Sequence, residues 1–264
     1  MTTLAVFRRE WIGRRNVFLL ALGMGCIQLV GMQFEAEVGK TTLLAVGSGT
    51  LLAWVVAALF GATMVGRDLE ERRFGFLLNQ PLRTGEIFAG KVGAGVGMAV
   101  LAAMVLCLPT LLFGGLWRLF SLKQAGQTVG TWLAGSLVCL LLFHAVSIQV
   151  RSRSPWLALD LAAWATFAWG VRQLSLRLIG AGTFEAMLHL WLVLLVVVTL
   201  GLALAGYLQV AQGRADLQRG HRWVSVTLAL SLGLALLVGS AQAAWVLRSK
   251  AESLKQQAVS PRIR

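Results

Sequence analysis

The sequence predicts an all-α protein, a polytopic membrane helical bundle of six or seven transmembrane helices preceded by an amphipathic interfacial helix. Two observations lead to this prediction. First, 57% of the 264 residues are hydrophobic and only 13% are charged, with a mean hydropathy of +0.74, which is too apolar for one water-soluble core. Second, several runs lack Asp, Glu, Lys and Arg, and each is long enough to cross about 30 Å of hydrocarbon. These runs are residues 16–34, 41–66, 92–117, 124–150, 186–213 and 223–247.

The amphipathic pattern of residues 3–15 predicts the interfacial helix. Leu4, Phe7 and Trp11 recur at i, i+3 and i+7, so they share one face of a helix. A helix with an apolar face and basic residues elsewhere lies in the headgroup plane of a membrane. The alternative is an ordinary positively charged flank of the first span, and both alternatives place the amino terminus in the cytoplasm. We expect the membrane-interface residues of this helix to be Leu4, Phe7, Arg8, Arg9 and Trp11.

Four spans follow from an inside amino terminus, at about residues 17–35, 43–65, 92–115 and 131–150. Residues 156–178 leave two topologies open, because they are apolar enough to insert but contain Asp160, which costs only about 2.5–3.5 kcal/mol inside a span. If they span, there are seven crossings, with fourteen Lys and Arg residues inside and ten outside. If they are re-entrant or interfacial, there are six crossings, with eighteen inside and six outside. The positive-inside rule favours six.

The polar residues within the apolar runs do not indicate catalysis. We expect Asp160 to reach the membrane interface, and Arg172 and Arg177 to anchor the other end of the same helix at lipid headgroups. The alternative is an ion or proton pathway through Asp160, for which His144 and His189 are weaker candidates. The three histidines are far apart in the sequence, and none has Glu or Cys at ligand spacing, so we expect no metal site. Ser/His/Asp catalysis lacks the nucleophile elbow that would support it. We therefore expect no enzyme activity, no catalytic residue and no cofactor in this chain.

The net charge of +13 raises the question of nucleic acid. The Lys and Arg residues lie at the ends of apolar runs rather than along one soluble face, which indicates anionic lipid headgroups as partners instead. Gly39-Lys40-Thr41 imitates the end of a phosphate-binding loop, but no buried strand precedes it, so it predicts no nucleotide site.

The segment between the second and third spans, residues 66–91, is the long charged stretch of the chain. Within it Phe74, Leu77, Leu78 and Pro81 follow i, i+3, i+4 and i+7, which predicts a short helix with one apolar stripe that ends at the proline. Such a helix can insert its apolar edge into a groove on a soluble partner, with charged residues around it fixing the register. The alternative is a solvated loop.

The same segment carries a resemblance to a known family. The residues concerned are Glu71-x-x-x-Gly75-x-Leu77-x-x-x-Pro81, then Ile87 and Gly90-Lys91. This pattern resembles the cytoplasmic coupling loop of exporter-type ABC transporter permeases, and Arg8-Arg9-Glu10-Trp11 resembles their elbow helix. One position departs from the family pattern, because Thr84 stands where a basic residue is usual and Arg83 comes one position earlier.

The resemblance implies a permease subunit that forms a translocation pathway in the cell inner (plasma) membrane. It implies two partners besides membrane lipid: a separate ABC ATP-binding subunit, which holds ATP and Mg²⁺, and a second permease subunit, the same or a related chain. On this basis residues 1–250 form the transmembrane permease domain, with an elbow helix at 3–15 and a coupling loop at 66–91, and residues 251–264 form a polar tail. The implied ATPase-docking residues are Glu70, Glu71, Arg72, Arg73, Phe74, Gly75, Leu77, Leu78, Pro81, Arg83 and Lys91.

A second function remains open beside the permease. The chain can instead be a non-transporting membrane scaffold or assembly protein, whose basic loop binds anionic lipid rather than an ATPase. An intramembrane enzyme is a third class, which the absence of clustered His, Asp or Ser in the sequence disfavours.

Overall fold

The structure is a computed structural model, and it describes residues 3–13, 16–32, 38–64, 83–113, 121–152, 154–213 and 216–259. These residues are almost entirely helical and include no strand, which confirms the all-α prediction. The helices are α1 (Thr3–Gly13), α2 (Asn16–Met32), α3 (Val38–Thr63), α6 (Thr84–Phe113), α7 (Leu122–Ser152), α8 (Trp156–Gly180), α9 (Phe184–Leu208), the short π-helix η2 (Gln209–Gly213) and α10 (Leu217–Val259).

Five of the described helices are long and apolar enough to cross a membrane. They contain the apolar stretches Val46–Thr63, Thr84–Pro109, Lys123–Ser152, Phe184–Gln212 and Leu217–Lys255. Many large aliphatic side chains on these helices are exposed, such as Leu59, Leu200 and Leu237. Hydrocarbon is the solvent in which such a surface is stable, so the chain is a multi-pass membrane protein.

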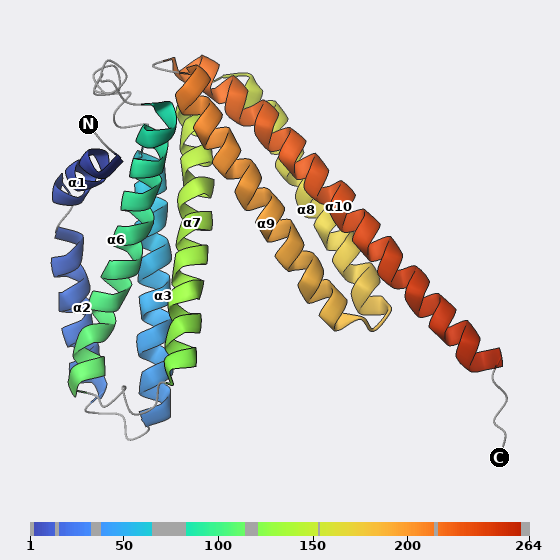
Figure 1. Cartoon of the computed structure of the whole chain (residues 1–264), viewed down its shortest axis with the longest axis horizontal. Helices are drawn as coiled ribbons and strands as arrows, with labels where there is room; N and C mark the ends of the chain where they lie inside the picture. The colour runs from blue at the N-terminus through green and yellow to red at the C-terminus, as the bar shows by residue number, and fades with distance from the viewer. Residues whose placement is uncertain are drawn as a thin grey trace.

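The segment whose topology the sequence left open forms one continuous helix, α8. This helix has 25 residues, as many as α9. Figure 1 shows that it lies beside α9 and α10, with its start near the end of α7 and its end at the turn into α9. A re-entrant segment would return to the end where it began. The helices from α2 to α10 therefore alternate in direction, as seven passes require, but neither α2 nor α8 is among the five helices long and apolar enough to cross a membrane.

The helices form two groups that meet at one end of the molecule and diverge toward the other (Figure 1). The first helix group contains α1, α2, α3, α6 and α7, and the second helix group contains α8, α9 and α10. Leu202, Val224 and Leu228 of the second group share a core with the first. Farther along, Val171 and Leu190 belong to a separate core made by the second group alone. The end where the groups meet is also the end at which α3 finishes and α6 begins, and we call it the loop end.

Close backbone contact fixes the geometry within the first group. A Cβ atom at Gly61 of α3 would collide with the backbone carbonyl of Leu140 in α7, so only glycine allows this approach. The same two helices share a hydrogen bond of 2.9 Å from Trp132 Nε1 to Thr50 Oγ1. Since hydrocarbon offers polar groups no alternative partner, these contacts specify how α3 and α7 pack.

The arrangement of α8 predicts which chain segments share a side of the membrane. Single cysteines at Arg83, Gln218 and Glu252, introduced after replacing Cys26, Cys107 and Cys139 with Ala, are to be labelled with a membrane-impermeant maleimide. With seven passes, positions 83 and 218 react from the same side and position 252 from the other. Reaction of 83 and 252 from one side, with 218 on the opposite side, would establish six passes.

Candidate functional site

Most of the predicted docking residues lie outside the described part of the chain. These are Glu70, Glu71, Arg72, Arg73, Phe74, Gly75, Leu77, Leu78 and Pro81. The structure does describe Arg83, which is exposed directly before α6. Its backbone N–H donates to Glu86 Oε2 at 3.0 Å, so Glu86 caps the helix start from the position that a capping box uses. Arg83 is therefore placed at the surface of the loop end.

Lys91, the last predicted docking residue, has its side chain in the interior. It is 2% exposed, and its Nζ donates to Glu10 Oε1 and to the backbone carbonyl of Met64, both at 2.9 Å. Glu10 belongs to α1 and Met64 directly follows α3. One ammonium group thus joins α1 and the two helices that flank the charged loop, and its burial is stabilised by opposite charge and a hydrogen bond.

The amino-terminal segment forms the predicted helix, but its apolar residues divide between two environments. Phe7 stacks on Trp11 with ring centroids 5.5 Å apart, and Trp11 lies 5.1 Å from the ring of Phe18 in α2. Leu4 and Arg8 are exposed. The side chain of Arg9 is outside the described part. Of the predicted interface residues, Leu4 is thus free to enter a membrane, whereas Trp11, with Phe7 stacked on it, packs α1 against α2.

Asp160 is buried against other helices and is not exposed toward lipid headgroups, contrary to the prediction. Its side chain is 2% exposed and its Oδ2 lies 2.6 Å from Nε2 of His221. The other ring nitrogen of His221 bonds the hydroxyl of Ser152. Ser152 ends α7, Asp160 lies in the second turn of α8, and His221 lies in the second turn of α10. This chain of hydrogen bonds therefore ties the last turn of the first helix group to two helices of the second.

The Ser152–His221–Asp160 chain has the residue types of a hydrolase triad. The Ser152 hydroxyl donates to the backbone carbonyl of Gln149 at 3.1 Å, a bond that competes with the transfer of its proton to histidine on which nucleophile activation depends. The arrangement is a buried hydrogen-bonded link between α7, α8 and α10.

A second pair of buried polar side chains lies at the same end. His144 of α7 and Gln209 of η2 are fully buried neighbours, and Lys91 is within electrostatic reach of His144. Gly206 makes this approach of α9 possible, since a Cβ there would be 2.8 Å from the Phe88 ring and 3.2 Å from the His144 ring. A π-helix such as η2 is rare and commonly marks a functional segment of a helix.

Several buried polar side chains of the described residues occur where the two helix groups meet, and we call six of them the polar junction, counting η2 with the second group. Three come from the first group and three from the second, all within about two turns of a helix end. The sequence offered no local signal for the junction, because its pairs are separated by 61 residues (Asp160 and His221) and 69 residues (Ser152 and His221). Its members are Lys91, His144, Ser152, Asp160, Gln209 and His221.

Metal binding finds no support in the described residues, where no three His, Cys, Asp or Glu side chains are placed to hold an ion together. His189, unlike His144 and His221, is exposed on α9. No family model, curated protein or solved structure matches the chain. Function has to be argued from the chemistry of the site itself.

The His221–Asp160 pair predicts a large loss of stability on removal of either partner. His221→Leu leaves a buried carboxylate without its partner, which costs roughly 3–5 kcal/mol, whereas His189→Leu changes an exposed histidine. Thermal unfolding of the purified chain in detergent measures both. The double variant Asp160→Leu/His221→Leu should lose less than the sum of the single variants by about 0.5–3 kcal/mol. Equal unfolding temperatures for His221→Leu and His189→Leu would contradict the assignment.

Proposed function

We propose that this chain is the integral membrane permease subunit of an ATP-driven ABC transporter of the exporter type. A separate ATP-binding subunit docks on the loop between α3 and α6, and the chain forms a translocation pathway together with a second permease subunit. ATP and Mg²⁺ belong to the partner. The amino terminus and the loop end face the cytoplasm of a cell with an inner (plasma) membrane.

The observation that carries the proposal is the position of Lys91. A docked ATPase can exert force only on the loop, and the two ends of the loop continue into α3 and α6. Lys91 connects α6 to the carbonyl of Met64, directly after α3, and to Glu10 of α1. A displacement of the loop therefore moves three helices together rather than bending one of them, which is what mechanical transmission from a soluble motor requires.

The polar junction supports the next step of transmission. The first helix group contacts the second at the loop end through Ser152, His221 and Asp160, and the two groups diverge from there (Figure 1). Two packed bodies joined at one end can rotate about that end as rigid units. Movement of α6 and α7 by the loop would then change the separation of the groups at the far end, where cargo would pass.

The permease proposal predicts that the chain purifies with an ATP-binding subunit. Replacing Phe74, Leu77 and Leu78 together with Ser removes the apolar stripe that would enter the groove of the partner, so the ATPase should be lost while membrane insertion persists. Affinity purification followed by quantification of the bound ATPase measures this. Wild-type amounts of ATPase on the triple variant would refute docking, and binding of anionic vesicles without any ATPase would favour the scaffold alternative.

Lys91→Met separates transmission from docking. The variant should retain the ATPase, because the side chain is internal, yet ATP hydrolysis by the reconstituted complex should lose its dependence on the permease. A coupling free energy of roughly 1–3 kcal/mol between permease and ATPase corresponds to a change of about five- to 150-fold in the effect of one on the other. Lys123→Met, which changes an exposed lysine at the start of α7, is the matched control. Equal hydrolysis rates for the two variants would contradict the role of Lys91.

A further inference from the structure

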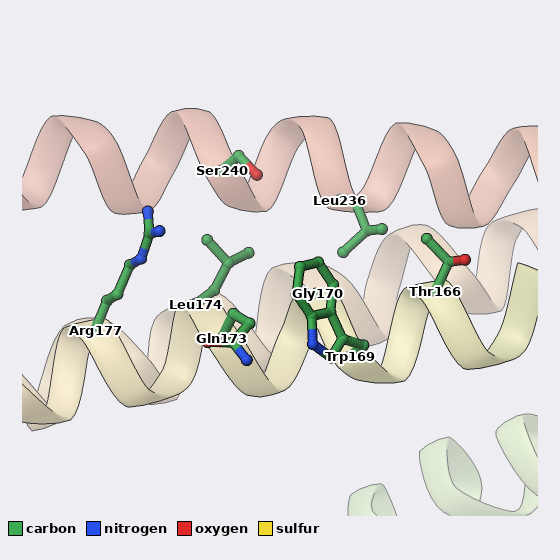
Figure 2. A pocket seen from close by; sticks show the side chains of 8 residues that line it. All are labelled: Thr166, Trp169, Gly170, Gln173, Leu174, Arg177, Leu236 and Ser240. Carbon is green, nitrogen blue, oxygen red and sulfur yellow. The ribbon is translucent and has the colours of Figure 1, made fainter.

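A groove between α8 and α10 lies outside the site described so far. Its volume is about 350 Å³, and both of its walls belong to the second helix group (Figure 2). Arg177 reaches from α8 toward α10 at one end of the groove, while Leu236 faces α8 from α10 (Figure 2). The floor is closed at Gly170, where a Cβ would lie 2.7 Å from Leu236. A binding role for this groove does not depend on the proposed permease function.

One end of the groove is cationic. Arg177 lies in the last turn of α8, and no acidic residue lines the groove in the described part of the chain. Lys250 of α10 bonds the backbone carbonyl of Ala181 in the turn that follows α8, so a second positive charge lies at this end. Glu185 lies in the first turn of α9 but does not line the groove. A guanidinium group is well suited to a phosphate, which it can bind through two parallel hydrogen bonds.

The rest of the groove is suited to a hydrocarbon chain. From Arg177 it extends along α8 as far as Thr166, a length of about 16 Å at the rise of an α-helix. Trp169 is 64% exposed beside it, and Leu237 is 71% exposed on the neighbouring turn of α10. The mouth of the groove is therefore surrounded by surface that faces hydrocarbon in a membrane. A free phosphate could bind Arg177 but would leave this apolar length of the groove unfilled.

The geometry points to a single anionic phospholipid as the occupant, with its phosphate at Arg177 and one acyl chain lying along Gly170 and Leu236. A lipid with a choline headgroup carries its own positive charge, which Arg177 and Lys250 repel. A phosphatidylglycerol headgroup has no such charge. The groove therefore selects anionic over zwitterionic lipid at the end of α8 that is opposite the loop end.

Native mass spectrometry of the full chain, titrated with phosphatidylglycerol or phosphatidylcholine in detergent, tests the site. One phosphatidylglycerol should remain bound to the wild type, and Arg177→Gln should weaken its binding about tenfold, as expected for loss of a hydrogen bond to a charged group. Arg172→Gln is the matched control, since Arg172 is exposed on the same helix but does not line the groove. It should bind within about twofold of the wild type.

Ser240→Phe provides a second variant that leaves the charge unchanged. Ser240 is exposed and lines the groove from α10, so a phenyl ring there occupies the space of the acyl chain and should also release the lipid. Equal losses in Arg177→Gln and Arg172→Gln would show general surface attraction and overturn the site. Equal retention of phosphatidylcholine, or unchanged binding to Ser240→Phe, would overturn it as well. None of these variants touches the docking loop, so failure here leaves the permease proposal standing.

Discussion

The structure depends on how polar groups are paired where the two helix groups meet. Lys91, His221 and Asp160 are each at most 2% exposed, and a polar or ionised group at such a position is stable only beside a partner. Each partner comes from another helix. Glu10 of α1 pairs with Lys91, and His221 of α10 pairs with Asp160 of α8. Apolar packing alone would hold helices together in many registers. These pairs select one arrangement, because a shift of a single turn leaves a buried polar group without its partner.

The same constraint relates the fold to the proposed function. Cores of the two groups merge at the loop end and separate beyond it, so the polar junction is placed where a force applied to the charged loop enters the bundle. Lys91 binds the helices that flank the loop into one body, and the Ser152–His221–Asp160 chain connects that body to the second group. A motor that acts from outside the membrane needs both connections. The far end carries the groove of the second group, which we assign to lipid.

Local patterns in the sequence were sufficient to predict the helices but insufficient to predict the polar junction. Absence of charge over twenty or more residues predicts a membrane helix, and the spacing of Leu4, Phe7 and Trp11 predicts α1. The positive-inside count favoured six passes and carried no information on whether α8 is one continuous helix, and Asp160 counted there only as a cost inside a span. Asp160 was expected at the interface since its partner, His221, lies 61 residues away. Lys91 was predicted to be a docking residue, and therefore to lie at the surface, because its partner Glu10 is 81 residues earlier in the sequence. Pairings of that kind depend on which helices cross.

The central claim is that the two helix groups rotate about the polar junction when the ATP-binding partner acts on the loop. Spin labels on cysteines at Thr131 of α7 and Phe184 of α9, both exposed and both far from the loop end, report the separation of the groups. A second pair, Gly47 and Thr131, lies within the first group and serves as the reference. In the reconstituted complex, ATP should shift the distance distribution of the 131–184 pair and leave that of the 47–131 pair unchanged. An unchanged 131–184 distribution, with ATP bound and hydrolysed, would contradict the account.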